Sequence, residues 1–94
     1  MFEIQADPDG RVHLRGRLDA AAADQAQQVF RGMSGPVIVE CSGLEYISSA
    51  GISVIMEAYK RLSGAGHSLR FELVTPRVKN VFVYAGLDRL LGIS

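Results

Sequence analysis

Residues 37–52 read VIVECSGLEYISSAGI, and this stretch decides the fold. It opens with Val37-Ile38-Val39, a continuous β-branched run after Pro36, which is typical of a central strand covered on both faces. Small and polar residues then lead to Ser49, where a helix is predicted to begin. A buried strand that passes through a short loop into a helix is the repeating unit of α/β proteins.

The helix predicted from Ser49 to Ser63 has its apolar residues on one face. Four of them recur at the i, i+3, i+4, i+7 spacing of an amphipathic helix: Ile52, Ile55, Met56 and Tyr59. Met56 and Tyr59 are therefore expected in the core, and Gly64 is expected to end the helix.

Two alternating segments open the chain. The turn residues Asp7-Pro8-Asp9-Gly10 separate two sets of apolar residues at every second position: Phe2, Ile4 and Ala6, then Val12, Leu14, Gly16 and Leu18. This pattern predicts an antiparallel hairpin. The other face of the second strand is basic, with Arg11, His13, Arg15 and Arg17. It could be a binding stripe, but a solvated face opposite Glu3 and Gln5 is more typical of a strand with one buried face.

A helix is predicted over residues 20–31, with Asp19 as its N-cap, because a carboxylate can accept hydrogen bonds from the free amides of the first turn. Its apolar face consists of Ala22, Ala26, Val29 and Phe30. Gly32 is expected to end this helix in the left-handed conformation.

The last third of the chain predicts a strand and a helix. Leu69, Phe71 and Leu73 alternate with polar residues, and Thr75-Pro76 is expected to cap and start the helix. The helix stripe consists of Val78, Val81, Phe82 and Ala85, Gly86 ends it, and three leucines are expected to seal the core: Leu87, Leu90 and Leu91.

The predicted order is β-β-α-β-α-β-α, which indicates an α/β fold with right-handed crossovers. We expect a mixed β-sheet of about four to five strands that opens with an antiparallel hairpin and packs against three to four α-helices. A chain of 94 residues with 48% hydrophobic residues supports one core. Residues 1–94 are therefore expected to form a single domain.

Composition excludes several kinds of partner. Ten Lys and Arg residues balance ten Asp and Glu residues, so no field of one sign favours nucleic acid or an anionic membrane, and a protein partner fits better. No apolar run approaches the roughly 20 residues of a membrane helix, so no membrane insertion is expected. A lone Cys41 and the lack of a leader sequence predict a cytoplasmic protein.

The sequence offers little for catalysis. Ser48, Ser49 and Cys41 are the candidate nucleophiles, with His13 and His67 as the imidazole bases, but no Gly-x-Ser-x-Gly elbow occurs. The glycine-rich turn before His67 lacks the third glycine of a dinucleotide site. One cysteine and two distant histidines give no metal-ligand pair. We therefore predict a protein that is not an enzyme and that has neither cofactor nor metal.

Residues 39–52 resemble the STAS-domain pattern, in which a strand ending in an acid is followed by a small-residue loop, an aromatic, an aliphatic, Asp-Ser-Ser/Thr-Gly and Leu. Further matches are Gly16-Arg17-Leu18-Asp19 and a closing helix and turn from Pro76 to Leu87. This alignment places Ser49 on the family's regulated serine. The chain departs from the pattern at Ser48, which stands where Asp is usual, and at Ala50, which stands where Ser or Thr is usual.

The resemblance implies an anti-sigma-factor antagonist in a partner-switching pathway. The unphosphorylated form would bind an anti-sigma factor with serine-kinase activity and free a sigma factor or another target. Phosphorylation at Ser49 would block binding, and a phosphoserine phosphatase would reverse it; Ser48 is the second candidate for phosphorylation. The implied partner-binding residues are Asp19, Ser48, Ser49, Ala50 and Gly51.

A serine at a helix start suits such a switch. An unmodified Ser49 could cap the helix while exposed, and the helix N-terminus tolerates a phosphate that a partner surface would have to desolvate. Simpler interpretations are that Ser49 is only an N-cap and that Gly51 serves close helix–sheet packing. The alternative function is a constitutive STAS accessory subunit of an ABC-type lipid-transport ATPase, and the chain alone is expected to be a monomer.

Overall fold

The computed structural model describes residues 1–93 and contains one four-stranded sheet and three helices. The strands lie in the order β1-β2-β3-β4: β1 (Phe2–Ala6), β2 (Arg11–Leu18), β3 (Val37–Ile47) and β4 (Leu69–Glu72). The helices are α1 (Ala23–Arg31), α2 (Ser49–Gly64) and α3 (Pro76–Tyr84). The predicted α/β class, element order and opening hairpin are confirmed.

The turn between β1 and β2 makes this pair an antiparallel hairpin. Asp7 N donates to Arg11 O at 2.7 Å, and Gly10, at φ +92°, adopts a conformation that a side chain would strain. The pairs β2–β3 and β3–β4 are parallel, so α1 and α2 are the crossover connections between them. In this register Val12, Val39 and Phe71 lie side by side across three strands.

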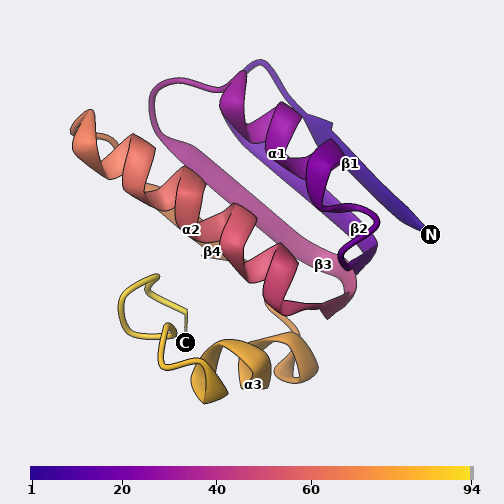
Figure 1. The fold of residues 1–94 in the computed structure, drawn as a ribbon. Coiled ribbons are helices and arrows are strands. Elements are labelled where there is room, and N and C mark those ends of the chain that lie inside the picture. Colours follow the sequence, from indigo (N-terminus) through magenta and orange to yellow (C-terminus); the bar gives the residue numbers. More distant parts are fainter. Residues whose placement is uncertain (94) are drawn as a thin grey trace.

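The helices cover one face of the sheet (Figure 1). Val12 and Val39 are fully buried beneath them, and Phe71 packs against Phe82 of α3 with ring centroids 5.9 Å apart. Ile38 lies on the opposite face, between Arg11 and Arg70 in the register, and is only half-buried. The prediction that this strand is covered on both faces is therefore wrong.

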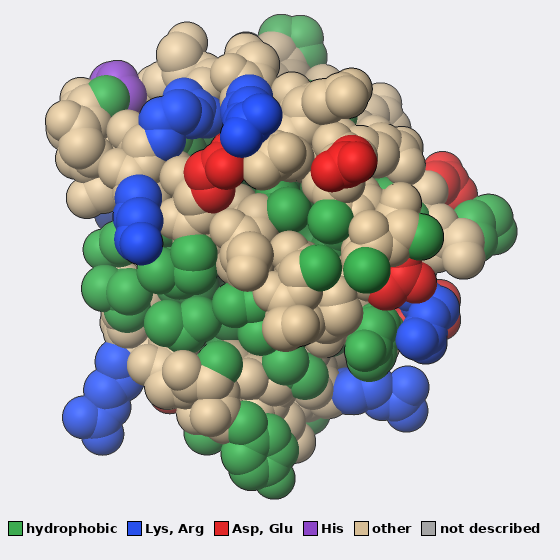
Figure 2. Space-filling model, in the orientation of Figure 1, with side chains coloured by type: hydrophobic (Ala, Val, Ile, Leu, Met, Phe, Trp, Pro, Cys, Tyr) green, Lys and Arg blue, Asp and Glu red, His purple; other side chains and the backbone are tan. Residues whose placement is uncertain are grey.

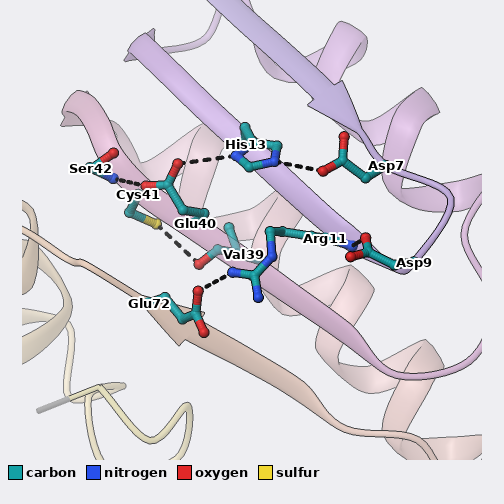
Figure 3. A network of polar contacts seen from close by, with 9 residues as sticks. All are labelled: Asp7, Asp9, Arg11, His13, Val39, Glu40, Cys41, Ser42 and Glu72. Atoms are coloured by element: carbon teal, nitrogen blue, oxygen red, sulfur yellow. Dashed lines mark hydrogen bonds and ion pairs between the residues drawn. The ribbon is translucent and has the colours of Figure 1, made fainter.

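Charged side chains occupy the uncovered face and pair with one another (Figure 3). His13 contacts Asp7 through Nε2 at 2.9 Å and Glu40 through Nδ1 at 3.1 Å, and Arg11 forms an ion pair with Glu72. Glu3 and Gln5 lie opposite Arg15 and His13 in the register, as expected for a solvated face. The basic residues of β2 thus belong to a mixed-charge surface.

The start and end of α1 differ from prediction. The helix begins at Ala23, three residues late, because residues 20–22 form a turn in which Asp19 Oδ1 accepts from Ala22 N at 3.2 Å. Asp19 therefore caps this turn and not the helix. Gly32 has φ −79°, an ordinary right-handed value, so the left-handed end predicted for it is wrong.

The apolar face of α2 is rotated from the predicted one. Met56 and Tyr59 are half-buried, whereas Val54 and Ala58 are buried beside Ile55. Gly64 is the last residue of the helix, as predicted. Gly66, at φ +83°, is the left-handed residue that follows.

The C-terminal third follows prediction in part. Thr75 Oγ1 accepts from Val78 N at 3.5 Å and caps α3, and Gly86, at φ +74°, follows the helix. However, Leu73 lies beyond β4 at φ +56° and is 68% exposed. Leu91 is buried, but Leu90 is 50% exposed and does not seal the core.

The predicted stripe of α3 is buried only in its first part. Val78 and Phe82 are buried and Val81 is half-buried, whereas Ala85 is exposed.

Within residues 1–93, none of the three helices is both long and apolar enough to span a bilayer.

Candidate functional site

The two loops that carry the predicted site lie beside each other. Leu18 ends β2 and Ile47 ends β3, these two residues are paired in the register, and Ser48 N donates to Leu18 O at 3.0 Å. The residues after Leu18 and after Ile47 therefore leave the same edge of the sheet. Ligands of open α/β sheets bind at this edge, outside the carboxyl ends of parallel strands.

Ser48 is the N-cap of α2. Its backbone is extended, at φ −95° and ψ 175°, and its Oγ accepts from Gly51 N at 3.2 Å. Ile52 N donates to Ser48 O at 2.9 Å, which is the first backbone bond of the helix. The interpretation of Ser49 as the N-cap is therefore wrong by one residue, and Ser48 satisfies the free amide.

Ser49 is the first residue of α2, and its side chain is exposed. Its carbonyl oxygen accepts from Ser53 Oγ at 3.1 Å, whereas its own hydroxyl bonds to no other residue in the range 1–93. The free amides of the first turn and the positive end of the helix dipole lie at this position. A negatively charged group on Ser49 would lie in a favourable field.

Gly51 holds α2 close to the sheet. A Cβ at this position would lie 2.6 Å from Leu18 O and 2.8 Å from Ile47 Cγ1, closer than packed atoms approach. Close packing therefore suffices to explain this glycine. Ala50 is half-buried, and Asp19, on the neighbouring loop, is also half-buried. The structure thus brings Asp19 and residues 48–51 to one edge of the sheet.

A cation–π pair, which the residue pattern did not reveal, borders the site. The Arg17 guanidinium lies 4.1 Å from the centroid of the Tyr46 ring, and Tyr46 is 37% exposed. Each residue lies two positions before the first residue of its loop, and the two are paired in the register. Their contact depends on the register between two strands, which spacing along the chain does not give.

Cys41 and the two histidines, which were candidate catalytic groups, lie in different surroundings. Cys41 is 1% exposed, and burial, helped by the nearby Glu40 charge, raises the pKa of its thiol to about 12. Both ring nitrogens of His13 face carboxylates, whereas His67 is exposed in the turn after α2. Within residues 1–93, no cluster of three His, Cys, Asp or Glu side chains could hold a metal ion.

Glu40 is ionised at every ordinary pH. Hydrogen bonds from the Ser42 side chain and backbone amide, together with His13, lower its pKa to about 2 against the opposing effect of burial. Glu40 is on β3 at the uncovered face and belongs to the sheet network in Figure 3, not to the edge that carries Ser49.

A family model described as "Mlab, STAS domain" matches residues 2–92. The chain belongs to the STAS-domain family. The match covers the hairpin, both crossovers and the closing helix, so the resemblance read from residues 39–52 is confirmed. A search of the curated proteins found no match to this sequence.

Three solved structures illustrate how widely this fold is shared. A proposed anti-sigma factor antagonist from Thermotoga maritima is 23% identical, with a TM-score of 0.80 over 97% of this chain and 83% of its own. The anti-sigma factor antagonist SpoIIAA in its unphosphorylated form is 20% identical, with a TM-score of 0.67 over 99% and 100% of the two chains. A sulfate transporter family protein from Wolinella succinogenes is 18% identical, with a TM-score of 0.77 over 94% and 76%. At these identities the likeness establishes the STAS fold alone.

Proposed function

We propose that this STAS domain is an anti-sigma-factor antagonist that acts by binding and not by catalysis. Its unphosphorylated form binds an anti-sigma factor with serine-kinase activity in the cytoplasm and frees a sigma factor or another target. The binding surface consists of the loop edge with Asp19, Ser48, Ser49, Ala50 and Gly51. The observation that carries the proposal is the exposed Ser49 hydroxyl at the head of a 16-residue helix.

Phosphorylation at Ser49 breaks this complex without unfolding the domain. A phosphate adds a charge of about −1.5 to −2 at a helix N-terminus, where amides and the dipole stabilise it. A partner packed on the same surface would have to desolvate that charge. A 10- to 100-fold loss of affinity requires only about 1.4–2.7 kcal/mol, so one misplaced charge is sufficient.

The geometry favours Ser49 over Ser48 as the phosphorylated residue. Ser48 is half-buried and its Oγ already accepts from Gly51 N, so a kinase would have to break the cap to reach it. The Ser49 hydroxyl forms no such hydrogen bond within the described chain. A phosphoserine phosphatase then resets the switch at an exposed side chain.

The second candidate function is a constitutive accessory subunit of an ABC-type lipid-transport ATPase. Two observations favour it, namely the description of the matching family model as "Mlab, STAS domain" and the Ser48 hydroxyl where the switch pattern has a carboxylate. In this role the same loop edge makes a fixed contact, and Ser49 is not modified.

A pull-down from native cell extract distinguishes the two functions. Wild type and Ser49→Asp are compared with Ser34→Asp, which places the same charge on an exposed serine before β3, at the opposite end of that strand. Mass spectrometry identifies the partners and the modified serines. The switch predicts that wild type and Ser34→Asp retain an anti-sigma kinase and that Ser49→Asp loses it. Retention of one transporter ATPase by all three proteins would establish the accessory subunit instead.

A further inference from the structure

A groove of about 530 Å³ lies along the outer side of β4, within the size range of ligand sites. Its walls are the second half of α2, which contributes Tyr59, and the C-terminal segment, which contributes Arg89 and Leu90. Residues 67–71 line it consecutively, so the backbone of β4 itself faces the groove. In Figure 2 hydrophobic side chains gather in this region, with Lys or Arg side chains at the margins.

The outer edge of β4 has no strand partner, because β4 is the last strand of the sheet. Val37 N donates to Ser68 O at 3.0 Å, and Val37 is the register partner of Leu69. In a parallel ladder, a residue flanked in this way turns its own N–H and C=O to the opposite side. The backbone groups of Leu69 and Phe71 therefore point outward, into the groove.

The C-terminal segment does not pair with these groups. Its backbone amides bond within the segment: Leu91 N to Leu87 O, Gly92 N to Arg89 O and Ile93 N to Asp88 O. Over residues 1–93, no backbone hydrogen bond joins this segment to β4. An unpaired edge of this kind is a template for an added strand.

The charges around the groove have one sign. Arg70 and Arg89 line it, no Asp or Glu does, and neither arginine forms an ion pair with any residue from 1 to 93. Glu72, the nearest acid along β4, is paired with Arg11 on the uncovered face. The apolar part of the lining includes Tyr59 and Leu90.

We propose that the β4 edge binds an extended acidic segment of a partner protein as a fifth strand of the sheet. Leu69 and Phe71 would each exchange main-chain hydrogen bonds with it. Side chains alternate along a strand, so acidic residues would lie beside Arg70 on the uncovered face and apolar residues beside Leu90 on the helix side. A second copy is a poorer occupant, because its β4 would bring Arg70 and Arg89 against the same arginines.

This site is distinct from the Ser49 surface. Ser63, which lines the groove, is 14 residues beyond Ser49, or about 21 Å along the helix. The binding of a segment at β4 therefore does not depend on phosphorylation or on the identity of the anti-sigma factor, and it can be tested on the isolated protein.

The test is an NMR titration of the isotope-labelled protein with a short soluble peptide that alternates valine and glutamate. We expect the amide resonances of Leu69 and Phe71 to shift and their hydrogen exchange to slow. Arg70→Glu and Arg89→Glu should each weaken binding by about 5- to 10-fold. Arg77→Glu, a matched reversal at an exposed position on α3 outside the groove, should leave the affinity unchanged.

Two further peptides separate strand addition from simple charge attraction. A peptide N-methylated at every residue cannot donate to the edge, and we expect it to bind at least tenfold more weakly. Equal binding of that peptide, or of one with lysine in place of glutamate, would overturn the proposal, as would unmoved Leu69 and Phe71 resonances. Sedimentation of the free protein as a dimer that Arg70→Glu disrupts or strengthens would also overturn it, by assigning the edge to a second copy.

Discussion

Gly51 and Gly64 lie on the same helix but in different surroundings. A Cβ on Gly51 would press on the backbone oxygen of Leu18, which cannot move aside, whereas nothing lies within 4 Å of a Cβ on Gly64. We expect Gly51→Ala to lower the free energy of unfolding by about 1–3 kcal/mol. Gly64→Ala should raise it by up to about 1 kcal/mol, because alanine is the better helix former. Urea denaturation measures both changes. A free energy of unfolding for Gly51→Ala equal to that of wild type would contradict the close contact.

The two adjacent serines should differ in their effect on stability. Ser48→Ala removes the bond from Gly51 N to the cap oxygen and should lower the free energy of unfolding by about 1 kcal/mol. Ser49→Ala removes an exposed hydroxyl and should change it by less than about 0.5 kcal/mol. The same denaturation experiment decides, and a larger loss for Ser49→Ala would show that Ser49 is the cap.

At this scale the sequence indicated the candidate site but not which of the two serines caps the helix. Residues 48 and 49 are both serines, so the cap rule fits either, and only the extended backbone of Ser48 separates them. Asp19, which the resemblance implied to share a surface with residues 48–51, lies on the loop beside them. Its function as the cap of a separate turn was not foreseeable, because Ala20 to Ala22 have high helix propensity.

Among the elements, the turn after β1 is linked to β2 and β3 by His13, which contacts Asp7 of the turn and Glu40 of β3. The Asp7 and Glu40 carboxylates can both accept a hydrogen bond from the His13 ring only when both ring nitrogens are protonated. The hydrogen bond with Asp7, followed by the one with Glu40, therefore raises the pKa of His13 above its ordinary 6.5. The stabilisation is therefore complete below about pH 6.5 and is lost as the pH rises through the folded-state pKa.

We expect the melting temperature of His13→Gln to fall furthest below that of wild type at pH 5 to 6, and the difference to shrink above pH 8. Asp7→Asn should remove part of the same pH dependence. Asp9→Asn, in the same turn, keeps an acceptor for Arg11 N and should leave the pH dependence unchanged. A difference between wild type and His13→Gln that is constant from pH 5 to pH 9 would contradict the proposed link.

The uncovered sheet face shows what element-level patterns omit. Val37-Ile38-Val39 is equally compatible with a strand covered on one face or on both. The strand order decides, because β2, β3 and β4 follow one another in a single direction. Two right-handed crossovers that progress in one direction place both helices on the same face. Sequence periodicity predicts the helices and strands but not the order of the strands within the sheet. The face of β3 that carries Ile38 was therefore expected to be covered by helices, and it is not.

Over the whole molecule, the buried core draws on every helix and on strands β2 to β4, from Val12 to Ile93. We propose on this basis that residues 1–94 form one STAS domain. The fold class was predictable because turn and capping residues in the sequence separate the helices and strands. The β4 groove was not, since it depends on where the C-terminal segment lies.

Ser49→Asp should leave this whole structure intact. The substitution adds a negative charge at the favourable end of α2, so we expect the free energy of unfolding to change by no more than about 1 kcal/mol, and upward. Ser63→Asp places the same charge near the other end of α2 and should lower it. Calorimetry and amide NMR spectra measure both, and widespread shifts in Ser49→Asp would mean that its binding defect reflects a changed fold.

The division of roles between Ser48 and Ser49 has a consequence for timing. Because the cap and the modifiable hydroxyl belong to different residues, adding or removing a phosphate requires no part of the chain to refold. The response time of the proposed switch is then determined by enzyme turnover and by encounter and release of the partner. A cell could therefore adjust its speed through the concentrations of kinase, phosphatase and partner.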